Sequence, residues 1–232
     1  MPAVIIPLAG PDFFTPKYGI RPLYKFKGTT FFEYVISKRW WLKDADLDLI
    51  FVLRDEGDKT EVMKKFIIQM FPDASTVILS HLTQGAPLST ISGLALLKSY
   101  NTPIIVDLLD IVFECNTDPL ALFDTSSNIS AIIPYFTSNH PKFSYLIING
   151  DNVLKTREKE VISNFASAGV YIFKNFESYM KCVIFCIQNP TICNVGSASF
   201  ICPSVNALIS KGNEVKAFSV DNVEPIGTLF HS

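Results

Sequence analysis

The residues best suited to chemistry follow directly on apolar, strand-like runs. Gly10 ends the run AVIIPLAG, and Arg21 lies further along the same loop. A glycine lets a phosphate approach the backbone closely, and a nearby cation can balance its charge. Because Arg21 precedes Pro22, its backbone avoids the helical region. The loop fits a phosphate-binding site, but an ordinary loop with surface cations has the same pattern, and neither glycine-rich nucleotide fingerprint is present.

A second candidate segment is LTQGAPLST, residues 82–90, which joins a predicted strand to a predicted helix. The amide of Gln84 can both donate and accept hydrogen bonds, which suits the edge of a nucleotide base. Gly85 at the bend would let a flat base approach the backbone. The alternative is a helix start capped by Thr83 or Ser89.

A third segment, PIIVDLLDIVFE, places Asp107 and Asp110 at the end of a buried strand. Mg²⁺ keeps several of its waters and needs only one or two carboxylates together with substrate phosphates. The sequence therefore favours a Mg²⁺ site here over the alternative, a pair of solvated loop acids.

The fourth segment, LKTREKEVISNFASAGVYIF, contains Glu158, Lys159 and Gly169. A carboxylate here could accept hydrogen bonds from sugar hydroxyls, and a lysine could neutralise a phosphate. The alternative is that these alternating charges form the solvent face of a strand.

The first half of the chain alternates strand-like with helix-like runs. Near-continuous apolar strands that alternate with helices predict a parallel sheet with both faces covered. Ligands of such sheets bind at the carboxyl ends of the strands, here the loops at 8–22, 81–87 and 107–112. The predicted strands are 3–10, 47–55, 75–81 and 102–110, and the predicted helices are 29–44, 58–71 and 87–100.

The second half predicts antiparallel strands within the same domain. Asn149 and Gly150 interrupt the run 143–160, and this pair favours a type I′ hairpin turn, in which both central residues have positive φ. The remaining predicted elements are strands 128–138, 166–174 and 213–221, with helices 175–189 and 198–211.

Composition excludes several classes of protein. A net charge of −2, with 48% apolar and 18% charged residues, indicates a globular domain and excludes nucleic-acid binding by bulk electrostatics. No apolar run approaches the ~18 residues that span a bilayer, so we expect no membrane insertion. The N-terminus lacks a charged leader region, so we expect a cytoplasmic protein. The five cysteines include no C-x-x-C, and Cys182 and Cys186 are expected to pack in the core rather than bind metal.

Five segments, taken in order, resemble the nucleotidyltransferase family that makes nucleotide-diphospho-sugars. The resemblance covers nearly the whole chain and implies a glycosyltransferase-A-like, three-layer α/β/α sandwich with a mixed, mostly parallel sheet. It also implies one domain, 1–232, with a nucleotide-binding half at 1–112 and a sugar-phosphate-binding half at 113–232. The segments are VIIPLAGPDFF…YGIRPLYKFKGTTFFEYVI, LTQGAPLST, VDLLDIVFE, REKEVISNFASAGVYIF and VKAFSVDNVEPIGT.

The resemblance implies transfer of a nucleotide from an NTP to a sugar phosphate with release of pyrophosphate, in surface-polysaccharide or capsule synthesis. Positioning and charge neutralisation dominate such transfers. A homo-oligomer is a possible assembly. The implied roles are nucleotide binding by Leu8, Ala9, Gly10, Gln84 and Gly85, catalysis by Arg21 and Asp110, Mg²⁺ binding by Asp110, and sugar-phosphate binding by Glu158, Lys159 and Gly169.

The chain departs from the family pattern at two places. In the first loop Asp12 replaces the second glycine, and Phe13 and Phe14 stand where the family has an arginine. Near the C-terminus, Glu224 and Pro225 occupy the region of the family's second metal-binding aspartate. Two alternatives therefore stay open: a glycosyltransferase that uses a finished nucleotide-sugar, and a non-catalytic protein that binds nucleotides or sugars.

Overall fold

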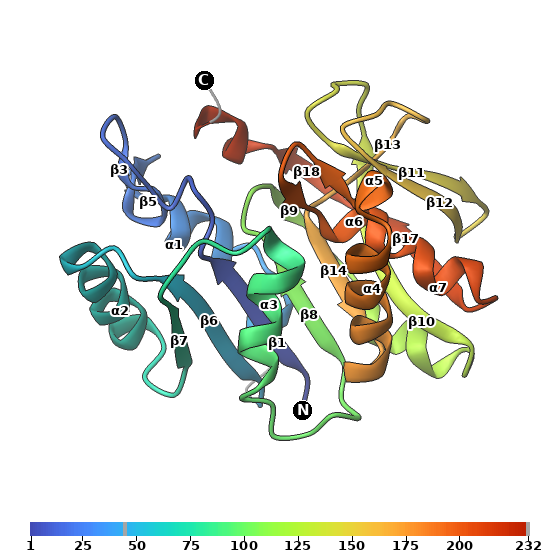
Figure 1. The fold of residues 1–232 in the computed structure, drawn as a ribbon, viewed down its shortest axis with the longest axis horizontal. Helices are drawn as coiled ribbons and strands as arrows, with labels where there is room; N and C mark the ends of the chain where they lie inside the picture. Colours follow the sequence, from blue (N-terminus) through green and yellow to red (C-terminus); the bar gives the residue numbers. More distant parts are fainter. Residues whose placement is uncertain (44–45, 231–232) are drawn as a thin grey trace.

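A ten-stranded sheet runs through the centre of the protein (Figure 1). The structure is a computed structural model, and it describes residues 1–43 and 46–230. In spatial order the sheet contains β13 (Phe165–Ser167), β11 (Ser144–Asn149), β12 (Asn152–Glu158), β17 (Glu214–Ser219), β10 (Ile129–Thr137), β14 (Val170–Phe173), β8 (Ile104–Asp107), β1 (Ala3–Leu8), β6 (Asp48–Arg54) and β7 (Ser75–Leu79).

The parallel arrangement predicted for the first half is confirmed. Strand β1 pairs in parallel with both β6 and β8, and β6 pairs in parallel with β7. In the second half only β10 and β17 pair in parallel, whereas β14, β11, β12 and β13 form antiparallel pairs. The sheet is therefore mixed rather than mostly parallel, because the strands of its second half pair mainly in antiparallel register.

Helices cover both faces of the sheet, because alternate residues of each strand point to opposite sides. Val4 and Ile6 of β1 belong to one apolar cluster, and Ile5 belongs to the other. The first cluster is covered by α1 (Phe31–Ile36) and α2 (Asp58–Met70). The second is covered by α3 (Ala86–Leu94), α4 (Phe176–Gln188), α6 (Ile201–Ser204) and α7 (Asn206–Ser210), with α3 and α4 in front of the sheet in Figure 1. Cys182 and Cys186 of α4 are buried, which confirms the core interpretation of these thiols.

Among the described residues, no helix is both long and apolar enough to cross a membrane.

Short elements complete the chain. The short strands are β2 (Phe14–Thr15), β3 (Gly19–Ile20), β4 (Lys25–Phe26), β5 (Thr29–Thr30), β9 (Val112–Glu114), β15 (Asn194–Val195), β16 (Ala198–Ser199) and β18 (Asp221–Glu224). The short helices are η1 (Arg21–Leu23), η2 (Trp40–Lys43), η3 (Pro119–Asp124), α5 (Pro190–Cys193) and η4 (Ile226–Phe230).

The predicted starts of the helices agree with the observed starts better than the predicted ends agree with the observed ends. Thr30 and Glu33 form a capping box at the start of α1. The predicted helix 29–44 stops early, however, and η2 follows as a separate turn, while the predicted end at residue 44 lies outside the described residues. The predicted helix 198–211 is divided into α6 and α7, and Pro203, which has no N–H to donate, lies just before the break.

The predicted hairpin is confirmed, with a different turn. Strands β11 and β12 pair in antiparallel register, and Asn149 pairs with Asn152. The two turn residues are therefore Gly150 and Asp151, and Gly150 alone of them has a positive φ, of 61°. This is not the type I′ turn expected at Asn149 and Gly150, because Asn149 remains in the strand.

A buried ion pair connects the end of β8 to the segment after α1. The Arg39 guanidinium donates to Asp107 through Nε at 2.6 Å and Nη2 at 3.1 Å, and both side chains are completely buried. Trp41 Nε1 and the backbone N–H of Leu109 also donate to the Asp107 carboxylate, at 3.1 and 2.9 Å. Asp107 is therefore a structural residue, and the metal interpretation is wrong for it because its oxygens are already used by these donors.

Asp107→Ala should lower the free energy of unfolding by about 3–5 kcal/mol, because it leaves the Arg39 charge buried without a partner. Denaturation in urea measures this loss. The matched control is Glu177→Ala, which removes an exposed, solvent-screened ion pair to Lys181 and should change the free energy of unfolding far less. Equal losses in the two variants would contradict the structural role of the buried pair.

Candidate functional site

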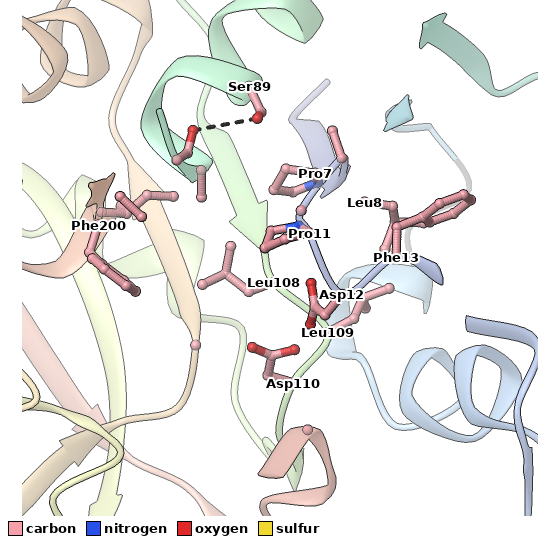
Figure 2. Close-up of a pocket in the computed structure, with 18 of the residues that line it drawn as sticks. Pro7, Leu8, Pro11, Asp12, Phe13, Ser89, Leu108, Leu109, Asp110 and Phe200 are labelled. Carbon is pink, nitrogen blue, oxygen red and sulfur yellow. Dashed lines mark hydrogen bonds between the residues drawn. The ribbon is translucent and has the colours of Figure 1, made fainter. Parts of the chain in front are cut away.

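A cavity of about 630 Å³ opens at the carboxyl ends of β1 and β8 and is lined by both halves of the chain. Figure 2 shows Asp12 and Asp110 on one side of this space, with Phe200 opposite. The structure brings nine of the ten predicted site residues to the cavity wall. These are Leu8, Ala9, Gly10, Arg21, Gly85, Asp110, Glu158, Lys159 and Gly169.

The tenth residue, Gln84, does not line the cavity. Its side chain is exposed, and its backbone carbonyl accepts a hydrogen bond from Ser199 N–H at 2.7 Å. In this structure the Gln84 side chain therefore lies outside the cavity wall, and base recognition by its amide stays a prediction. Its neighbours Leu82 and Thr83 line the cavity instead.

Glycine is required at position 85 by a neighbouring backbone segment, whereas the sequence pattern predicted that it makes room for a nucleotide base. A Cβ at this position would lie 2.1 Å from the carbonyl oxygen of Ser199, and φ is 120°, a conformation open almost only to glycine. The backbone that approaches Gly85 is therefore that of Ser199, which pairs with it in an isolated bridge. This contact joins the start of α3 to β16 and closes one wall of the cavity.

In the first loop, an acidic side chain covers the glycine. A Cβ on Gly10 would lie 2.7 Å from Asp12 Oδ1, so the Asp12 carboxylate covers the Cα of Gly10. Phe13 is 2% exposed, packs in the apolar core and points away from Asp110 (Figure 2). Phe13 is therefore a core residue that also lines the cavity wall, whereas Phe14 lies outside the lining and packs against Lys59, whose Nζ is 3.7 Å from the ring centroid.

Arg21 connects the two sides of this loop region. Its guanidinium donates through Nη1 to Asp12 and through Nη2 to Asp110. The guanidinium carbon also lies 5.4 Å from the ring centroid of Phe31 and 5.0 Å from that of Phe230. Two carboxylates and two rings therefore fix the Arg21 side chain, which is 12% exposed.

The last helical turn holds the backbone of Asp110. Gly227 N–H donates to the Asp110 carbonyl oxygen at 2.7 Å, and a Cβ on Gly227 would lie 2.9 Å from Asp110 Cβ. The close approach of the backbone at position 227 to Asp110 therefore requires glycine there. Glu224 binds Lys27 and Tyr34 on the surface instead of approaching Asp110, so it does not replace the family's second metal-binding acid.

Sequence reasoning missed two contributors to this site. In the sequence Asp12 is only a departure from a loop pattern, and no sequence signal indicates its ion pair with Arg21. Phe230 lies next to the chain terminus and contacts Tyr18, Tyr24 and Phe31 edge-on at 5.2 to 5.5 Å. The sequence signal for this cluster is that the segment 13–34 is rich in aromatic residues and that Phe230 follows the final I-G-T motif.

The opposite wall carries a polar cluster at the end of β12. Ser144 donates to the Glu158 carboxylate, which is partly withdrawn from solvent. Burial raises the pKa of Glu158 to about 7, and the nearby Asp110 charge adds to the rise, while Ser144 and Lys159 oppose it. Glu158 therefore changes charge near neutral pH, and it is not part of a fully solvated strand face.

Lys159 and Gly169 complete this wall. Lys159 has φ of 52°, and its Nζ lies 5.1 Å from the centroid of the Phe200 ring. Gly169 has φ of 75°, and its carbonyl accepts from Leu108 N–H at 3.1 Å, which joins the wall to the end of β8. Nearby, Ser167 donates to the Tyr171 hydroxyl at 3.1 Å, and burial raises the pKa of Tyr171 well above its usual value.

The donor set for a metal ion is small. Among residues 1–43 and 46–230, no group of three or more His, Cys, Asp or Glu side chains could hold a metal ion. Asp110 is the predicted ligand, and its carboxylate faces the cavity beside Asp12 (Figure 2). One or two carboxylates suffice for Mg²⁺ when substrate phosphates supply the other ligands. The chemistry of these residues thus fits Mg²⁺ bound together with a phosphate ligand.

Known structures share this fold. A nucleoside-diphosphate-sugar pyrophosphorylase from Vibrio cholerae RC9 has a TM-score of 0.81 and 22% sequence identity, with 98% of each chain covered. A putative glucose-1-phosphate thymidylyltransferase from Bacillus anthracis has a TM-score of 0.75 and 15% identity, covering 98% of this chain and 90% of that one. A UDP-glucose pyrophosphorylase in complex with UDP-glucose has a TM-score of 0.69 and 16% identity, covering 99% and 94%.

Sequence comparisons add no further relative. No protein-family model matches the chain, and no curated protein matches it. The resemblance to nucleotide-sugar nucleotidyltransferases is confirmed at the level of the fold, because it extends over nearly the whole chain in several solved structures.

Gly85→Ala should reduce stability more than a glycine substitution in open space does. The new methyl group would overlap the Ser199 backbone, whereas at Gly212, where φ is 76°, a Cβ meets nothing within 4 Å. Gly212→Ala is thus the matched control and should cost about 1–2 kcal/mol through backbone strain alone. Urea denaturation of both variants measures the difference, and equal losses would contradict the close contact.

The contribution of Glu158 to the free energy of unfolding of the unliganded protein should fall as pH rises from about 4.5 to 7. The native state holds this proton to higher pH than the unfolded state does, so deprotonation favours unfolding. Glu158→Gln should remove this contribution, on the order of 1–3 kcal/mol, and so be relatively more stable at pH 8 than at pH 5. Urea denaturation at both pH values tests this, and an unchanged pH dependence would contradict it.

Proposed function

We propose that the protein transfers a nucleoside monophosphate from an NTP to a sugar phosphate and releases pyrophosphate. The observation that carries the proposal is the single cavity at the carboxyl ends of β1 and β8, where Arg21 and Asp110 meet Glu158 and Lys159 from the other half of the chain. The shared fold supports the same class of reaction, since solved neighbours bear the names of pyrophosphorylases and a thymidylyltransferase. A pathway in surface-polysaccharide or capsule synthesis stays a prediction.

The two halves of the cavity wall suit two substrates. Residues of the 1–112 half, including Leu8, Ala9 and Gly10, would line the nucleotide side, and α3 begins at Gly85 on the same side. Residues of the 113–232 half, Glu158 and Lys159, would bind the sugar phosphate, with Gly169 leaving room beside them. A phosphate oxygen of the sugar phosphate could then reach the α-phosphorus of the nucleotide from the opposite side.

The reaction needs charge stabilisation more than proton transfer. The sugar-phosphate oxygen forms a bond to the α-phosphorus, the bond from this phosphorus to the bridging oxygen breaks, and pyrophosphate leaves with that oxygen. Arg21 would stabilise the charge that develops on the phosphates, after exchanging part of its contact with Asp12 or Asp110 for phosphate oxygens. Asp110 would hold Mg²⁺, which supplies charge neutralisation to the phosphates when bound.

Arg21→Ala and Asp110→Ala should each lower Mg²⁺-dependent pyrophosphate release by at least about 100-fold, because each removes a group that stabilises charge in the transition state. A coupled pyrophosphate assay with each of the four NTPs and a panel of sugar 1-phosphates measures the rates. Lys65→Ala, on the exposed face of α2, is the control and should keep the wild-type rate. Undiminished turnover in both cavity variants would refute the site.

Two further measurements, of nucleoside diphosphate release and of melting temperature, separate the alternatives. A glycosyltransferase would release a nucleoside diphosphate from a nucleotide-sugar without pyrophosphate. A non-catalytic binding protein would show a higher melting temperature with nucleotide or nucleotide-sugar and no turnover.

A further inference from the structure

The Asp12 carboxylate occupies the space into which a side chain at position 10 would point, directly over the backbone of Gly10. A Cβ on Gly10 would lie only 2.7 Å from Asp12 Oδ1, and both residues line the cavity. The Asp12 side chain is 27% exposed, so its charge is only partly screened by water. An anionic ligand in this part of the cavity would therefore meet a negative charge before it meets the loop backbone.

Asp12 also partly neutralises the positive charge of Arg21, the cation on this side of the cavity. Arg21 donates to Asp12 and Asp110 together, so two carboxylates face one guanidinium. The rings of Phe31 and Phe230 hold Arg21 from its other side, which limits its freedom to move toward a ligand. The other cations on the described cavity wall, Lys142 and Lys159, belong to the opposite half of the chain.

We propose that Asp12 determines which nucleotides the cavity prefers, by disfavouring free triphosphates relative to nucleotide-diphospho-sugars. The inference rests on the proposed function and adds a selectivity to it. Repulsion from Asp12 grows with the negative charge of the ligand, and a free triphosphate carries more charge than a diphosphate whose outer phosphate is esterified to a sugar. Asp12 thus shifts binding toward the nucleotide-sugar and away from the NTP.

The test compares dissociation constants in pairs of nucleotides. ATP, CTP, GTP and UTP, each with its matching nucleoside-diphosphate-glucose, are titrated by calorimetry in buffer with EDTA, so that the ligand carries its full charge. The variants are Asp12→Asn, which keeps the shape, and Asp12→Gly, which removes the side chain. Asp124→Asn, an exposed acid of η3 away from the cavity, is the control.

The proposal expects the ratio of the NTP dissociation constant to that of the nucleotide-sugar to fall about tenfold in both Asp12 variants and to stay unchanged in Asp124→Asn. An unchanged ratio in folded Asp12 variants would overturn it, as would equal weakening of both ligands, which would indicate that Asp12 only orients Arg21. Binding of no nucleotide by any protein, including wild type, would instead overturn the proposed function together with this inference.

A second measurement needs only the wild-type protein, in case the Asp12 variants do not fold. Added NaCl screens the repulsion from Asp12, so the same ratio should fall as salt concentration rises. A ratio that rises with salt would show that attraction from the cavity's cations dominates for the triphosphate, and this would overturn the proposal.

Discussion

The buried pair of Arg39 and Asp107 is the constraint on which the site depends. A carboxylate at the centre of an apolar sheet is tolerable only when its oxygens are bonded, and here Arg39, Trp41 and the N–H of Leu109 bind them. Leu109 is held with a positive φ of 56°, which turns the chain sharply at the end of β8. The next residue, Asp110, is thereby directed to the cavity while Asp107 stays in the core.

The two ends of the chain meet around Arg21. The loop after β1 supplies Arg21 and Asp12, and the final turn η4 supplies Phe230 against the guanidinium and Gly227 against Asp110. These contacts are aromatic, ionic and hydrogen-bonded at once, so a change in the last turn would alter the position of the site's main cation. The altered first loop and the altered C-terminal motif therefore belong to one local structure, in which Asp12 faces Asp110 across Arg21.

The opposite wall differs in its chemistry. Glu158 is withdrawn from water beside Ser144, so its charge depends on pH near neutrality, whereas the acids around Arg21 are held by an ion pair. The cavity thus combines an ion-paired cluster with a separate carboxylate that can act as donor or acceptor of hydrogen bonds. This division is consistent with a phosphate-rich ligand on one side and a hydroxyl-rich ligand on the other.

Features that depend on neighbouring residues could be read from the sequence. The apolar periodicity predicted the strands and helices, and Gly150 marked a hairpin, because each is decided within a few residues. Which charged side chains form pairs depends instead on the packing of segments far apart in the chain. Asp107 finds its partner 68 residues away and Arg21 contacts Asp110 at a separation of 89 residues, and Gly85 is required by the backbone of Ser199. Such contacts depend on how distant segments pack. The sequence predicts that the loops at the carboxyl ends of the strands lie at one edge of the sheet, but not which of their side chains touch.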